Sequence, residues 1–161
     1  MKHDLLVTRW DSADLLVLRN GDVCERIAGA DIQRVMLVCE GGDTPADLQF
    51  AVIETATEHV LLPADSGIAR RIFFERQDYW TQRSCVYWVT GRHAPLPRHL
   101  CPGIWLLRRH RPAYLHLPRS ELAPLIEQWR LEGPQTWEQR KWAQSASKRH
   151  RVALAIAPGV H

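Results

Sequence analysis

Short apolar runs separated by turn-forming residues occupy the first 63 residues of the sequence, and this pattern constrains the fold most strongly. Residues 14–19 and 22–27 are two such runs, and Asn20-Gly21 stands between them. Asparagine and glycine tolerate the positive φ angles that both central positions of a type I′ turn require, so this segment predicts a β-hairpin. The hairpin is the most specific local prediction in the sequence, and it favours an antiparallel sheet.

Further runs extend this hairpin into a β-meander. The remaining strand-like runs of the first part are residues 4–10, 32–40, 48–56 and 58–63. Residues 11–14 have turn composition and separate the first run from the second. Strand composition returns later in the chain at residues 84–90, 104–109 and 113–117. The last two of these runs are expected to form a hairpin around Arg111-Pro112.

Three helices are predicted. The central one covers residues 66–80, where apolar side chains recur near one helical face: Ile68, Ile72, Phe73 and Trp80. Ser120 is expected to cap a second helix over residues 121–131. The apolar stripe of that helix should cover the sheet and consists of Leu122, Leu125, Ile126 and Trp129. Thr136 is expected to cap a third helix over residues 137–148.

Length and composition favour one folded domain. The chain has 161 residues, of which 45% are apolar and 24% charged, and this suffices to bury a core without disulfides or metal. We expect a single α+β domain over residues 1–149, in which an antiparallel β-meander sheet packs against the central helix and a C-terminal helical pair. If the domain divides, the boundary falls near residues 81–90. Residues 150–161 are expected to form a disordered tail, with a strand at residues 152–157 as the alternative.

The sequence shows no signal for export or membrane insertion. No apolar run reaches the about 18 to 20 residues that a membrane span needs. Asp4 and Arg9 interrupt the apolar stretch that a signal peptide requires. The four cysteines, at positions 24, 39, 85 and 101, form no CxxC pair, which is typical of reduced and buried thiols. We therefore expect a cytoplasmic protein.

The two parts of the chain carry opposite net charge. Residues 1–66 hold five Lys and Arg against twelve Asp and Glu, whereas residues 67–161 hold sixteen against six. A surface of one sign attracts a partner of the other sign and speeds their encounter. Alternatively, the two parts neutralise each other within one fold.

The predicted binding surface is residues 98–119, where cationic and aromatic side chains are densest. The candidate binding residues are Arg98, His99, Trp105, Arg108, Arg109, His110, Arg111, Tyr114 and Arg119. Arginine presents a fork of donors to carboxylates and phosphates, and aromatic rings stack on bases or fill protein hot spots. This composition favours a protein partner with an acidic surface, and a nucleic acid is the alternative. A third interpretation pairs the arginines with carboxylates of their own domain.

No motif in the sequence specifies catalysis or a metal site. GxSxG and HExxH are absent from it, and so is a glycine-rich phosphate loop. Four candidate zinc ligands, whose spacing fits no common zinc module, are Cys85, His93, His99 and Cys101. We therefore predict no cofactor and no metal. His59 beside Glu58 is expected to be an exposed pair. An enzyme would require a pocket in which a histidine or carboxylate converges with arginines.

One further pattern combines Asp31-Ile32 before a strand, Val35 within it and Leu62-Pro63 before a helix. This arrangement, over residues 14–80, resembles bacterial pleckstrin-homology-like modules and small bacterial proteins of similar layout. The resemblance covers roughly half of the chain and implies a binding platform with no catalytic residues to carry over. The chain departs from that pattern after residue 80, where a hairpin and two helices follow.

These observations together predict a non-catalytic bacterial protein-binding domain. One specific form is an immunity or adaptor protein that binds a toxin or effector through its basic aromatic surface. The alternative is a nucleic-acid-binding protein or small nuclease that uses the same arginines. Whether the chain also binds a second copy of itself stays open.

Overall fold

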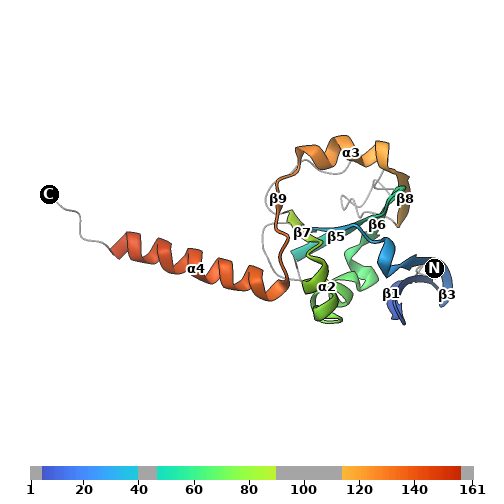
Figure 1. Cartoon of the computed structure of the whole chain (residues 1–161), viewed down its shortest axis with the longest axis horizontal. Helices are drawn as coiled ribbons and strands as arrows, with labels where there is room; N and C mark the ends of the chain where they lie inside the picture. Colours follow the sequence, from blue (N-terminus) through green and yellow to red (C-terminus); the bar gives the residue numbers. More distant parts are fainter. Residues whose placement is uncertain (1–4, 40–46, 90–113, 157–161) are drawn as a thin grey trace, which may run out of the picture.

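The computed structural model describes residues 5–39, 47–89 and 114–156, and these form two β-sheets and four α-helices (Figure 1). The strands are β1 (Leu6–Asp11), β2 (Asp14–Arg19), β3 (Asp22–Ala28), β4 (Arg34–Cys39), β5 (Leu48–Glu54), β6 (Glu58–Pro63), β7 (Val86–Val89), β8 (Leu115–Pro118) and β9 (Leu131–Glu132). The helices are α1 (Ile68–Phe73), α2 (Gln77–Arg83), α3 (Arg119–Gln128) and α4 (Trp137–Ile156). The chain therefore has the α+β fold that the sequence predicted.

The first sheet is the meander β1-β2-β3, and it confirms the predicted hairpin. Asn20 and Gly21 connect β2 to β3 with φ angles of 55° and 94°, and both values are positive, as a type I′ turn requires. The predicted turn between β1 and β2 is also present, with Ser12 at a φ of 54°. The meander buries Leu15 and Val17 in a core shared with the second sheet.

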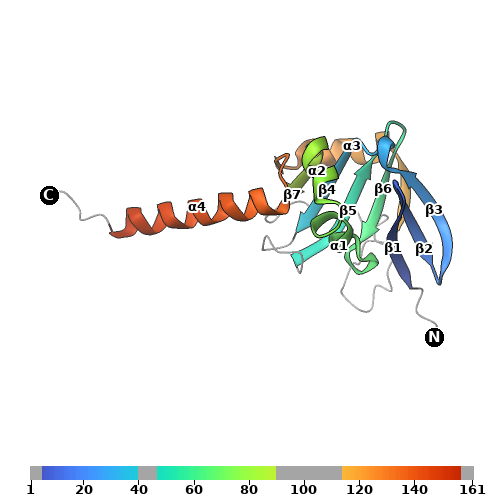
Figure 2. The same ribbon diagram turned by 60° about the horizontal axis from the view of Figure 1, so that its bottom comes forward.

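The second sheet has the strand order β8-β6-β5-β4-β7-β9, and both of its faces are covered (Figure 2). Its pairs are antiparallel except β4 and β7, which run parallel because the chain crosses back through α1 and α2 before β7 begins. One face packs on the first sheet, α1 and α2, through residues that include Val35, Leu37, Ile53, Leu62 and Trp88. The other face packs on α3, through residues that include Met36, Val52, Leu61, Leu122 and Ile126.

The prediction of one continuous central helix over residues 66–80 is wrong, because the chain divides it into α1 and α2. Arg76 adopts a φ of 56° between the two helices, and its guanidinium lies 4.5 Å from the centroid of the Trp10 ring. A left-handed residue does not continue a right-handed helix. The break lets Trp80 Nε1 donate to the Glu75 carbonyl at 3.2 Å. The apolar side chains that predicted the helix are all buried: Ile68, Ile72, Phe73 and Trp80.

α3 covers the sheet as predicted, but it begins earlier. Its first residue is Arg119, and Pro118 precedes it in an extended conformation, with a φ of −58° and a ψ of 146°. Ser120 therefore lies inside the helix, and the predicted cap at this residue is wrong. The helix also ends earlier than the predicted residue 131, at Gln128, so Trp129 is buried but lies beyond the helix in an extended conformation. Within α3 the predicted stripe packs on the sheet, with Leu122 and Ile126 buried and Leu125 partly buried.

Thr136 caps α4 as predicted. Its Oγ1 accepts a hydrogen bond from the Gln139 amide at 3.3 Å, and Gln139 Oε1 accepts one from the Thr136 amide at 2.8 Å. This reciprocal pair is a capping box, which satisfies two N–H groups at the start of a helix. The helix then continues to Ile156, so residues 150–156 are helical and form neither the predicted tail nor a strand.

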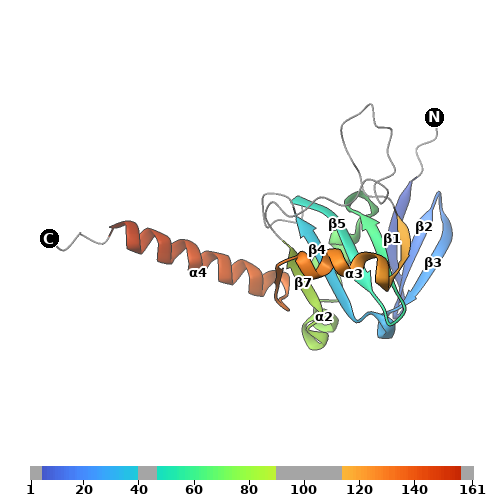
Figure 3. The same cartoon turned by 90° about the horizontal axis from the view of Figure 1, so that it is seen from above.

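α4 projects away from the two sheets, and its first residues hold it to them (Figures 1 and 3). The Trp137 ring lies 5.8 Å from the Trp88 ring. The Arg140 guanidinium lies 4.7 Å from the Trp88 ring and donates to Glu132 at 2.9 Å. Every described side chain of α4 from Lys141 onward is exposed. None of the described helices is long and apolar enough to cross a membrane.

Candidate functional site

A row of three polar side chains crosses the face of the second sheet that α3 covers. Arg34 in β4 is the register partner of Glu54 in β5, and Glu54 is the register partner of His59 in β6. Side chains alternate between the two faces of a strand, and these three share their face with the apolar residues that pack on α3. We call Arg34, Glu54 and His59 the polar row, because strand pairing alone places them side by side.

Glu54 is the centre of the polar row and is held as a carboxylate. Its side chain is 7% exposed, and Arg34 donates to it twice, from Nε at 3.1 Å and from Nη2 at 2.7 Å. His59 Nε2 lies 2.9 Å from one of its oxygens, and Arg119 Nη2 lies 3.4 Å from the other. Burial by itself would raise the pKa of Glu54, but the hydrogen bonds from Arg34 and His59 outweigh it and hold that pKa below its ordinary value.

This hydrogen bonding fixes the role of each group in the polar row. An ionised carboxylate only accepts hydrogen bonds, so His59 Nε2 is the donor in its contact with Glu54. In a neutral imidazole the other nitrogen, Nδ1, is then an acceptor. Because Glu54 is saturated with donors and its pKa is lowered, it is poorly suited to take up a proton as a general base near neutral pH. A histidine and a carboxylate thus converge with arginines here, which is the arrangement that an enzyme would require, but the lowered pKa of Glu54 argues against this carboxylate as a general base.

A cleft of about 440 Å³ lies between α3 and the polar row, and we call it the α3 cleft. Besides the polar row, its lining residues are Arg119, Ala123, Ile126, Glu127, Trp129 and Leu131. Ala123 has the smallest side chain of the lining and stands in α3 one turn from both Arg119 and Glu127, so it leaves space between them. The cleft thus combines a cation, a buried polar wall and apolar surface.

The polar row was not predicted from the sequence. His59 was expected in an exposed pair with Glu58, but it is 1% exposed and contacts Glu54 instead. The sequence did contain a signal for this burial. Residues 60–62 of the run 58–63 are all apolar, so both faces of the strand are expected to be covered and neither faces solvent. A polar residue within such a run needs an internal partner.

Two of the predicted binding residues lie in the described part of the chain. Tyr114 is half-buried and donates from Oη to Glu25 at 3.0 Å, and burial together with this neighbour raises its pKa. Arg119 Nη2 lies 3.4 Å from the Glu54 carboxylate, so this arginine follows the interpretation that pairs the arginines with carboxylates of their own domain. The other candidates lie outside the described residues: Arg98, His99, Trp105, Arg108, Arg109, His110 and Arg111.

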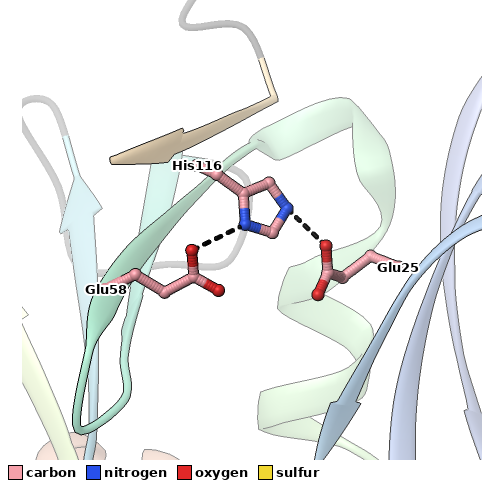
Figure 4. A group of neighbouring side chains, drawn as sticks. All are labelled: Glu25, Glu58 and His116. Carbon is pink, nitrogen blue, oxygen red and sulfur yellow. Dashed lines mark hydrogen bonds and ion pairs between the residues drawn. The ribbon is translucent and has the colours of Figure 1, made fainter. Parts of the chain in front are cut away.

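A second polar cluster joins the two sheets (Figure 4). The His116 ring, from β8, lies between the carboxylates of Glu58 in β6 and Glu25 in β3. Its Nδ1 is 3.0 Å from Glu58, and its Nε2 pairs with Glu25. One ligand atom from each residue lies within 4.8 Å of the others, so the set could hold a metal ion. Both ring nitrogens already face carboxylates, however, so we interpret the cluster as a polar contact between the two sheets.

The other candidate metal set has one member in the described part of the chain. Cys85 is buried immediately before β7, and burial raises the pKa of its thiol. A raised pKa disfavours the thiolate form that zinc binds. His93, His99 and Cys101 lie outside the described residues.

The fold and the α3 cleft define an α+β domain with a polar row beneath a covering helix. No protein-family model, curated protein or solved structure matches the chain. The resemblance of residues 14–80 to pleckstrin-homology-like modules therefore stays a prediction. Function has to be argued from the geometry of the described residues.

Acid is expected to weaken the fold through Glu54. A carboxyl group whose pKa is lowered by folding stabilises the protein above its unfolded pKa, and this contribution is lost as the pH falls through the folded pKa. We expect the free energy of unfolding to decrease as the pH drops below about 4.5, and more steeply for the wild type than for Glu54→Gln. Urea titrations over a pH series measure both proteins. A difference between them that stays constant at every pH contradicts a lowered pKa.

Proposed function

We propose that the chain is a non-catalytic, cytoplasmic protein-binding domain that docks an acidic partner on α4. The observation that carries this proposal is the position of α4, which projects from the sheets (Figure 3). All its described side chains from Lys141 onward are exposed. Most helix stability in proteins comes from tertiary packing, and a helix that packs on nothing is marginal in water. A partner that covers α4 would supply this packing.

The exposed part of α4 carries both apolar and cationic side chains. Trp142 is 73% exposed and Val152 is 56% exposed. At 3.6 residues per turn, Lys141, Lys148 and Val152 recur at i, i+7 and i+11 and lie along one side of the helix. Arg149 lies two turns from Trp142 on the neighbouring side. Tryptophan and arginine are the residue types that most often dominate binding hot spots.

The charge of α4 favours an acidic partner. Beyond Arg140, which is buried and paired with Glu132, residues 141–156 contain four Lys and Arg and no acidic residue. Complementary charge steers the encounter of two proteins and discriminates against wrong partners. An immunity or adaptor protein that binds a toxin or effector is one form that this function can take. The proposed docking surface on α4 has the same kind of composition as residues 98–119, because both segments combine cationic and aromatic residues.

A nucleic acid is the second candidate partner, because the cations of α4 also suit phosphates. Each neutralised phosphate releases counterions, so affinity for a nucleic acid falls steeply with salt concentration. A contact centred on a desolvated Trp142 depends on salt much less, because its energy comes from apolar burial. The salt dependence of the affinity therefore separates the two candidates.

Photo-crosslinking from α4 tests the proposal. A photoreactive amino acid in place of Trp142 is expected to capture a protein partner. The same group in place of Phe74, which is 61% exposed at the end of α1, is the control. With the captured partner purified, Trp142→Ala should weaken binding by about tenfold or more, and Phe74→Ala by less than about twofold.

The possible outcomes are distinct. Equal labelling from both positions, or an affinity that Trp142→Ala leaves unchanged, would remove α4 as the docking surface. Capture of a nucleic acid, with an affinity that falls steeply as salt rises, would favour the second candidate.

A further inference from the structure

The polar contact between the two sheets lies at the edge of the core that they share. The His116 ring lies between the carboxylates of Glu25 and Glu58 (Figure 4), and the hydroxyl group of Tyr114 lies beside it. His116 is the register partner of Val60, which is buried in the shared core, so its ring points toward the first sheet. Glu58 lies two residues before Val60 on the same face. Glu25 faces them from β3, and its pairing partner in β2 is buried in the same core.

The number of hydrogens in this cluster decides which of its contacts are hydrogen bonds. Glu58 lies 3.0 Å from Nδ1 of the His116 ring, and Glu25 pairs with Nε2. The Tyr114 hydroxyl group lies 3.0 Å from Glu25 and 2.5 Å from Nε2, so it has two possible acceptors. An ionised carboxylate only accepts, and a hydroxyl group carries a single hydrogen. A neutral imidazole carries one N–H group, whereas an imidazolium carries two.

The imidazolium form satisfies both carboxylates. Nδ1–H donates to Glu58, and Nε2–H donates to Glu25. The Tyr114 hydroxyl group then donates to Glu25 as well, because the protonated Nε2 has no free lone pair. Hydrogen bonds between ionised groups are about twice as strong as those between neutral groups. In this form the ring connects β8 to both β6 and β3.

In the neutral form one ring nitrogen has to accept a hydrogen bond. The Tyr114 hydroxyl group is within reach of Nε2, whereas the described residues place no donor at Nδ1. The single N–H group therefore stays on Nδ1 and donates to Glu58, and the hydroxyl group turns from Glu25 to Nε2. Burial raises the pKa of Tyr114, so its hydroxyl group keeps its hydrogen. Glu25 is then left with no donor among the described residues.

We propose that the Tyr114 hydroxyl group exchanges its acceptor when His116 changes its protonation state, and that this exchange makes the contact between β3 and the second sheet sensitive to pH. The contact is complete when the ring is charged, and it loses Glu25 as the pH rises through the titration of the ring. β3 is an edge strand with mostly exposed side chains, so it can open locally while the core stays folded. This device is independent of the partner that α4 docks.

Two further charged or titratable groups face the cluster. The Arg19 guanidinium, from β2, lies 6.0 Å from the centroid of the Tyr114 ring, and arginine stays protonated in proteins. The second group is the thiol of Cys24 in β3, which also faces Tyr114. Cys24→Ser removes this thiol, and its pH response should match that of the wild type.

Hydrogen exchange of the full-length protein tests the proposal at about pH 5.5 and about pH 8, a range in which histidine ordinarily changes its charge. Rates are corrected for intrinsic exchange, and β5, which lies inside the second sheet, is the internal reference. Protection of the β3 amides relative to β5 should fall by about fivefold or more at the higher pH. In His116→Gln this ratio should not change with pH. The control is His150→Gln, which removes an exposed histidine of α4 and should respond as the wild type does.

Tyr114→Phe separates the exchange of acceptor from a simple ion pair. Without the hydroxyl group, the neutral His116 ring has no donor for Nε2, so the charged form is favoured more strongly. Over a full pH series, the loss of β3 protection should therefore move to higher pH by about half a pH unit or more. A hydroxyl group that only fills space would not cause this upward shift.

The wild type also tests the proposal by itself, which matters if far-UV circular dichroism shows that His116→Gln does not fold. The ¹³C carboxyl signal of Glu25 should change with the same midpoint as the ring signals of His116, because the carboxylate loses its donors. Three results would overturn the proposal. They are a Glu25 signal that does not follow the ring, β3 protection that is equal at both pH values or falls equally in folded His116→Gln, and a midpoint that Tyr114→Phe does not raise.

Discussion

Replacing Glu54 with glutamine is expected to lower the free energy of unfolding by about 3 kcal/mol. Arg34 and His59 would lose the carboxylate that they contact at 2.7 and 2.9 Å. Removing one partner of a buried ion pair leaves the other charge uncompensated, at a cost of about 3–5 kcal/mol. The lower end applies here because the Arg34 side chain is 29% exposed, so water compensates part of its charge. Glutamine preserves the shape of the side chain, so the decrease in the free energy of unfolding measures the loss of the charge and not the creation of a cavity.

Glu127→Gln is the matched control, because Glu127 lines the same cleft but is exposed. We expect this change to alter the free energy of unfolding by less than about 0.5 kcal/mol. Urea denaturation at neutral pH measures both variants. If Glu54→Gln also costs less than about 0.5 kcal/mol, solvent compensates the remaining groups and the polar row does not hold the sheet together.

Local sequence signals predicted those parts of the fold that depend on neighbouring residues. Asn20-Gly21 forms the turn between β2 and β3 because its backbone preference is intrinsic to the two residues. Thr136 and Gln139 form a capping box for the same reason, since both partners lie within one helical turn. For such elements, the residues that decide the conformation are adjacent in the sequence.

The polar row depends instead on which strands become neighbours. The alternation of side chains along a strand determines which residues of that strand share a face. It does not determine that β4 and β5 are neighbours, or that their register places Arg34 opposite Glu54. The break between α1 and α2 could not be predicted from the sequence for a related reason. Arg76 packs on Trp10 from β1, a contact that the apolar periodicity of the segment does not contain.

The length of α4 was underestimated for a different reason. Apolar periodicity detects a helix only where one of its faces is buried. Residues 152–157 are apolar at every position, so the run has no periodicity that distinguishes a helix from a strand. The described side chains in this part of α4, His150 and Val152, are exposed.

Truncating Trp88 to alanine is expected to cause the largest loss of stability, about 4 kcal/mol. Trp88 is fully buried and stacks on Phe73 with the ring centroids 5.0 Å apart. It also lies 5.8 Å from Trp137, and its Nε1 donates to the Gln135 carbonyl at 3.3 Å. Its removal leaves a cavity where the second sheet meets the start of α4, and close-packed neighbours refill such a cavity only in part.

Trp142→Ala is the matched control for this change, because it removes the same atoms from a side chain that is 73% exposed. We expect it to cost less than about 0.5 kcal/mol, since it uncovers no core. Hydrogen exchange should in addition quicken near Trp137 in Trp88→Ala but not in Trp142→Ala. If the two variants lose similar stability, α4 packs along its length on the domain in solution. In that case it is not free to dock a partner.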